Sequence, residues 1–109
     1  MLENFQKLWN QLLDWLKGLG VEKISDADLS AILDKQAEGK NLRWRTSLVD
    51  FLKLIGADHD SESRAALGKE FGIEGVSGTA EYNEALRVAL FNKIAENGGN
   101  IPAELRSID

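Results

Sequence analysis

The chain has 109 residues, no cysteine and a formal net charge of −5. This length fits a single domain with a core of its own, and the lack of cysteine excludes disulfide frameworks, thiolate zinc sites and cysteine nucleophiles. Because an acidic chain lacks the excess of Lys and Arg that neutralises phosphates, we expect no nucleic-acid partner.

Membrane segments and export signals are absent from the sequence pattern. No apolar run approaches the roughly 20 residues that a membrane-spanning helix needs, and no basic segment followed by an apolar core marks a secretory signal. We therefore expect a soluble, cytoplasmic protein.

Residues 2–19 predict a strongly amphipathic first helix. At about 100° per residue, the apolar side chains fall on one arc: Leu2, Phe5, Leu8, Trp9, Leu12, Leu13, Trp15, Leu16 and Leu19. Gly18 and Gly20 are expected to end this helix. We expect residues 1–20 to pack on a helical domain formed by residues 24–109. The alternative is a helix lying on a membrane surface, although its polar face carries no basic excess.

Two further helices are predicted before Gly56. Ser25 and the acidic turn after it are typical of an N-terminal cap, and the helix that follows is expected to stop at Gly39. Its inward residues are Leu29, Ile32, Leu33 and Ala37. The next helix is expected to begin near Trp44 and to end at Gly56. Its shared apolar face consists of Trp44, Leu48, Phe51, Leu52 and Ile55.

The last two predicted helices differ in length. The fourth is short, capped by Asp60 or Ser61. The fifth runs from about Thr79 to Asn97 and is apolar on two edges, so we place it centrally. The only candidate for a strand is the short segment 73–76, because no segment shows sustained alternation. The pattern therefore predicts an all-α fold, a single small domain of about five helices in an irregular orthogonal bundle.

The segment from Asp58 to Glu62 surrounds His59 with carboxylates. A calcium loop would need a glycine and a carboxylate where Ser63 and Lys69 stand, so we interpret the segment as a helix cap. The serines beside His59 belong to the same cap and give no support for a Ser-His-Asp triad. Phosphate-binding glycine motifs are also lacking. We therefore predict no enzymatic activity, no metal site and no cofactor.

Arg43, Trp44 and Arg45 are the candidate binding residues, in the one basic stretch between two acidic ones. A helical projection places Arg45 inside the apolar arc, where a charge needs a partner or must reach outward along its stem. One interpretation is an internal ion pair with Asp34, Glu38 or a carboxylate of the last helix. The other is that Arg43 and Arg45, with Trp44 beside them, receive an anionic or acidic partner.

Three motifs follow one another along the chain: LRWRTSLVDFLKLI at 42–55, SRAALGKEFG at 63–72 and AENGGNIP at 95–102. With these motifs, the chain resembles a bacterial family known as domain of unknown function 3597 over about residues 24–106. The resemblance implies a small helical domain with no assigned activity, substrate or cofactor. It gives least support to any role for residues 1–20.

These observations favour a non-enzymatic interaction or structural module that is a monomer and binds another protein. A peripheral membrane-associated protein, anchored through the first helix, is the alternative from a different class. A small-anion binder that uses the region from Arg43 to Arg45 is a third hypothesis.

Overall fold

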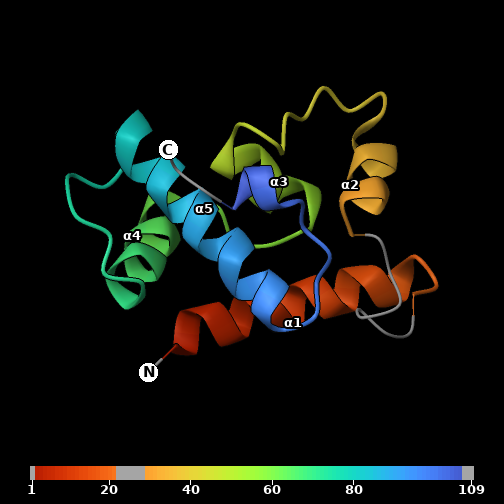
Figure 1. Cartoon of the computed structure of the whole chain (residues 1–109), viewed down its shortest axis with the longest axis horizontal. Coiled ribbons are helices and arrows are strands. Elements are labelled where there is room, and N and C mark those ends of the chain that lie inside the picture. Colours follow the sequence, from red (N-terminus) through yellow and green to blue (C-terminus); the bar gives the residue numbers. More distant parts are fainter. Residues whose placement is uncertain (1, 22–28, 107–109) are drawn as a thin grey trace.

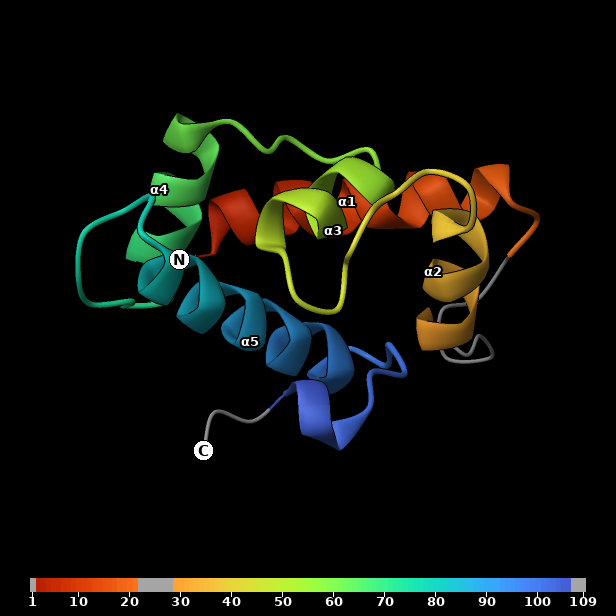
Figure 2. The same cartoon turned by 90° about the horizontal axis from the view of Figure 1, so that it is seen from above.

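The computed structural model describes residues 2–21 and 29–106, which contain five α-helices around one apolar interior (Figures 1 and 2). They are α1 (Glu3–Gly18), α2 (Leu29–Ala37), α3 (Leu48–Leu54), α4 (Ser61–Glu70) and α5 (Ala80–Glu96), followed by the short 3-10 helix η2 (Ala103–Leu105). The described residues form no strand, and segment 73–76 is irregular, so the candidate strand there was wrong. The predicted all-α class is confirmed.

Helix α1 lies along one side of the molecule, at the lower edge of Figure 1, from below α4 to below α2. Its inward side chains recur at helical spacing and are buried: Phe5, Leu8, Leu12 and Leu16. Trp9 and Trp15 are partly buried and pack against the same core. Among the residues that the structure describes, no helix is long and apolar enough to cross a bilayer.

The start of α1 is capped by a side chain from another helix. Leu2 provides no side-chain cap. Instead, the carboxylate of Glu70, at the end of α4, accepts hydrogen bonds from the backbone N–H of Asn4 at 2.7 Å and of Phe5 at 3.1 Å. The ring of Phe71 meets that of Phe5 edge to face, with centroids 5.7 Å apart. Because free N–H groups and the helix dipole favour a carboxylate, the end of α4 holds the start of α1.

Helix α3 begins at Leu48, so the predicted start near Trp44 was wrong. Ser47 has an extended backbone, and its hydroxyl accepts a hydrogen bond from the backbone N–H of Asp50. Such a cap fixes the first turn of a helix. Trp44 and Arg45 lie in a separate turn, which is closed by hydrogen bonds from the N–H groups of Thr46 and Ser47 to the Arg43 carbonyl. The projection that placed Arg45 within a helical apolar arc therefore does not apply.

The other predicted helix ends agree with the structure where it describes them. Asp60 caps α4 and Thr79 caps α5. Gly39, beyond the end of α2, has a φ of 76°, a left-handed conformation that suits glycine. Ser25, the expected cap of α2, lies outside the described residues.

Helix α5 crosses the middle of the molecule (Figure 1) and packs against α3 and α4. Its two predicted apolar edges are both covered, since Leu86 and Leu90 are buried on one and Val88 and Phe91 on the other. The Phe91 ring meets the rings of Trp44 and Phe51 at edge-to-face centroid distances of 5.9 and 4.9 Å. This aromatic group joins α5 to α3 and to the turn before it.

Candidate functional site

A hollow of about 290 Å³ opens on the surface beside the connection between α2 and α3. All three candidate binding residues line it. The full lining is Asp34, Ala37, Leu42, Arg43, Trp44, Arg45 and Thr46. The turn before α3 therefore brings the basic residues together with the carboxylate of α2.

Trp44 belongs mainly to the interior, because only 2% of its surface is exposed. Its indole Nε1–H donates a hydrogen bond to Oδ1 of Asp34 at 3.0 Å. The predicted burial of Trp44 beside Leu48 and Phe51 is confirmed. Trp44 thus contributes the wall of the hollow and orients Asp34.

Arg45 makes an ion pair with Asp34, one of the three partners considered from the sequence. Its Nε and Nη2 donate to Oδ1 and Oδ2 of Asp34 at 3.1 and 2.7 Å. The guanidinium carbon lies 4.8 Å from the centroid of the Trp44 ring. The Arg45 and Asp34 side chains are 41% and 50% exposed, so the pair lies at the surface and contributes little stability by itself.

The ion pair between Arg45 and Asp34 determines how these two residues are charged. Hydrogen bonds from Arg45 lower the pKa of the Asp34 carboxyl below its usual value, against a smaller opposing effect of burial. The same hydrogen bond raises the pKa of Arg45. Asp34 is therefore a stable anion that largely neutralises Arg45, and an incoming anion would compete with it.

Arg43 carries the remaining positive charge of the hollow. Its backbone N–H donates to Oδ2 of Asp50 at 2.9 Å. The side chain is exposed, and within the described residues its guanidinium makes no hydrogen bond or ion pair. Arg43 is thus the cation of the hollow that is open to a partner.

A second depression, the α3–α5 groove, has a volume of about 460 Å³ and lies between the start of α3 and the start of α5. Its lining residues are Thr46, Ser47, Leu48, Val49, Ala80, Glu81, Asn83 and Glu84. Thr46 also lines the hollow, so the two depressions adjoin. No local pattern in the sequence indicates this groove, because its walls are distant in the chain and form no motif.

Arg87 on α5 is a buried charge that the sequence analysis missed, with only 6% of its surface exposed. Its Nε donates to Oε2 of Glu84 at 3.2 Å, and its Nη2 pairs with Oε1 of the same residue. The guanidinium lies over the Phe91 ring, and Nη1 has no partner among the described residues. Its position four residues before Phe91, between the two apolar edges of α5, was the available signal.

The model of a family described as a domain of unknown function, DUF3597, matches residues 17–102. The chain belongs to the DUF3597 family. Neither the comparison with curated proteins nor that with solved structures gives a match. The DUF3597 range includes the hollow and the α3–α5 groove, whereas most of α1 precedes it.

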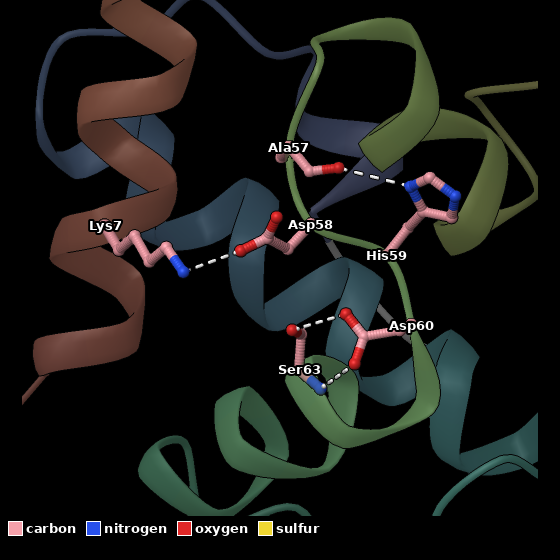
Figure 3. A network of polar contacts seen from close by, with 6 residues as sticks. All are labelled: Lys7, Ala57, Asp58, His59, Asp60 and Ser63. Carbon is pink, nitrogen blue, oxygen red and sulfur yellow. Dashed lines mark hydrogen bonds and ion pairs between the residues drawn. The ribbon is translucent and has the colours of Figure 1, made fainter.

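The carboxylates before α4 have structural contacts in this DUF3597 domain (Figure 3). Asp58 pairs with Lys7 of α1 at 2.7 Å, and Asp60 accepts hydrogen bonds from the backbone N–H and hydroxyl of Ser63. Nδ1 of His59 lies 3.2 Å from the Ala57 carbonyl oxygen. These contacts confirm the helix-cap interpretation. Within residues 2–21 and 29–106, no three His, Asp or Glu side chains are grouped to hold a metal.

Proposed function

We propose that this DUF3597 domain is a non-enzymatic interaction module that binds an acidic segment of a second protein molecule in the hollow. The observation that carries the proposal is the exposed Arg43 guanidinium, which has no described contact, beside a partly apolar wall. A partner carboxylate can form two parallel hydrogen bonds with such a guanidinium.

The walls of the hollow suit protein recognition. Leu42 and Ala37 are half-buried and pack against the core, so they offer fixed apolar surface. The Arg45 guanidinium is already held by hydrogen bonds to Asp34 and by the face of the Trp44 ring, which reduces the conformational entropy lost on binding. Arginine beside apolar and aromatic surface is a common composition for the residues that dominate protein interfaces.

The surroundings of the titratable groups support a non-enzymatic role. His59 is exposed and lies in the loop that caps α4. The carboxylates of Asp58 and Asp60 are engaged by Lys7 and Ser63. A general acid or base usually lies in a cleft that can hold a substrate, and these groups line neither the hollow nor the α3–α5 groove. Asp58 lines only a small pocket of about 30 Å³ beside α1.

The membrane alternative receives less support from the packing of α1. The four core side chains of α1 face the interior of the protein, whereas a membrane anchor would present them to lipid. Leu19, with 38% of its surface exposed, is the most exposed residue of the predicted arc. Co-sedimentation of the whole chain with anionic liposomes tests this alternative, and we expect the chain to stay in the supernatant.

The interaction proposal is tested by charge reversal at Arg43. We expect the wild-type chain to capture a protein from the native lysate and Arg43→Glu to lose it. Lys69→Glu, an equal charge change on α4, is the matched control and should retain capture. Thermal melts should show that all three chains fold. Equal capture by the three chains, or no capture by any, would contradict the proposal.

A further inference from the structure

The hollow and the α3–α5 groove join at Thr46 into one continuous surface, here called the Thr46 strip. In Figure 1 the connection between α2 and α3, the start of α3 and the start of α5 all lie along the upper edge of the molecule. The strip therefore runs along one side of the fold, opposite α1.

The two ends of the Thr46 strip have the same arrangement of charged residues, but their exposed charges are opposite in sign. Each end contains one internal ion pair, Arg45 with Asp34 in the hollow and Arg87 with Glu84 at the groove. Each end also has one exposed charge without a contact in the described part of the chain: the guanidinium of Arg43 and the carboxylate of Glu81. After internal pairing, the strip is positive at one end and negative at the other.

A surface of this kind is complementary to a copy of itself. In a two-fold symmetric interface, any contact from residue i to residue j is repeated from j to i. A two-fold axis near Thr46 would set the Arg43 end of one copy against the Glu81 end of the other, twice. Val49 of the groove and Leu42 of the hollow, both half-buried, would supply apolar contact beside the charged ends.

We propose that the Thr46 strip binds a second copy of this chain, with Arg43 of each copy paired to Glu81 of the other. The proposal rests on the proposed function, because it identifies the acidic partner of the hollow as the chain's own α5. The strip has fewer lining residues than the roughly 20 to 30 that each partner contributes to a stable interface. The dimer should therefore be weak, form at high concentration and dissociate as salt screens its exposed pairs.

Sedimentation velocity of the full chain, over a concentration series from micromolar to about 1 mM at low salt, tests this interface. Wild-type chain should shift toward a dimer as concentration rises. Arg43→Glu and Glu81→Lys should each weaken self-association at least about tenfold, because like charges then face each other twice. Mixing these two variants in equal amounts should restore association, since both contacts in the mixed dimer again join opposite charges.

The mixing experiment separates a specific pairing from general charge effects. Lys69→Glu, the matched control, should associate like the wild type, and melting curves should show that every variant folds. A chain that stays monomeric throughout, single variants that dimerise like the wild type, or a mixture that fails to associate would each overturn the dimer proposal. Capture of another protein through Arg43 by a monomeric chain would overturn it while leaving the proposed function intact.

Discussion

At the scale of single residues, Trp44 connects the interior to the hollow. Its ring packs against Phe91, and its Nε1–H holds the carboxylate that pairs with Arg45. The sequence predicted that Trp44 is buried, because it shares apolar spacing with Leu48. The hydrogen bond to Asp34 was not predicted, since α2 and the turn before α3 are separate in the chain.

We expect Trp44→Ala to lower the free energy of unfolding by about 3–5 kcal/mol, as large aromatic truncations in cores do. Trp44→Phe keeps an aromatic ring but removes the N–H donor, so it should cost less, on the order of 1 kcal/mol for the lost hydrogen bond. Urea unfolding curves of both variants give these differences. A loss below about 1 kcal/mol for Trp44→Ala would show that the tryptophan contributes little to the core.

The Asp34 pair predicts a specific pH dependence. Arg45 lowers the pKa of Asp34 in the folded state. The pair therefore stabilises the folded state fully above the unfolded-state pKa of Asp34, about 3.9. This stabilisation is lost as the pH falls through the lower pKa of the folded state. Asp34→Asn should therefore lower the urea midpoint at pH 7, and the difference from wild type should shrink below about pH 4. In an Arg45→Met background this change with pH should be much smaller. A difference that is constant from pH 7 to pH 2.5 would contradict the assignment.

Gly68, on α4, has a packing role that its helical position does not suggest. A Cβ at this position would lie 1.7 Å from the hydroxyl oxygen of Tyr82, a buried side chain of α5. Gly68→Ala should lower stability by about 1–3 kcal/mol through overpacking, despite the helix propensity of alanine. Gly18→Ala is the control, because a Cβ there meets no atom within 4 Å, and it should be neutral or stabilising. Thermal melts that rank the two variants equally would refute this role.

At the scale of helices, the starts whose caps the structure describes are of two kinds. Helices α3, α4 and α5 begin at caps from their own segments, Ser47, Asp60 and Thr79. Such caps are visible in sequence, as the expected Asp60 or Ser61 and the expected Thr79 start show. Helix α1 takes its cap from Glu70, 66 residues from Asn4, which no local pattern predicts.

Glu70→Gln should weaken the start of α1 by roughly 0.5–2 kcal/mol, the usual range for loss of a cap. Hydrogen exchange should then speed up at the first amides of α1 more than at those of α5. Glu74→Gln is the matched control, because Glu74 is exposed and has no described contact. Equal protection of the first α1 amides in both variants would show that the Glu70 carboxylate does not stabilise the start of α1.

At the scale of the whole molecule, α1 completes an interior that the family range does not complete by itself. The DUF3597 match begins at residue 17, but Phe5, Leu8, Leu12 and Leu16 belong to the same core as Leu67 and Phe91. Removing α1 would expose the apolar residues beneath it. Contiguous apolar surface of that kind is uncommon on a monomeric domain.

Deletion of residues 1–20 should therefore destabilise or aggregate the remaining chain. Full burial of each Leu or Phe side chain contributes about 1.5–3 kcal/mol, so the four core residues of α1 account for much of the stability of a small domain. Size-exclusion chromatography and thermal melts of the truncated chain measure the effect. A truncated chain that is monomeric and melts cooperatively at the wild-type midpoint would refute this expectation.

The sequence by itself determined the helices, most of their ends and their buried faces. These features depend on apolar periodicity, capping side chains and glycines, which act within a few residues of the chain. The start of α3 was misplaced because apolar spacing continued back to Trp44, while the cap that decides the start is Ser47.

The tertiary structure alone decided how the charges are distributed over the candidate site. It selected Asp34 as the partner of Arg45, left Arg43 open, paired the buried Arg87 with Glu84 and joined the hollow to the groove at Thr46. Most of these relations join residues of different elements, and their strength depends on distance, burial and competing partners. The order of residues along the chain does not contain these three quantities, because they are set only when the helices pack together.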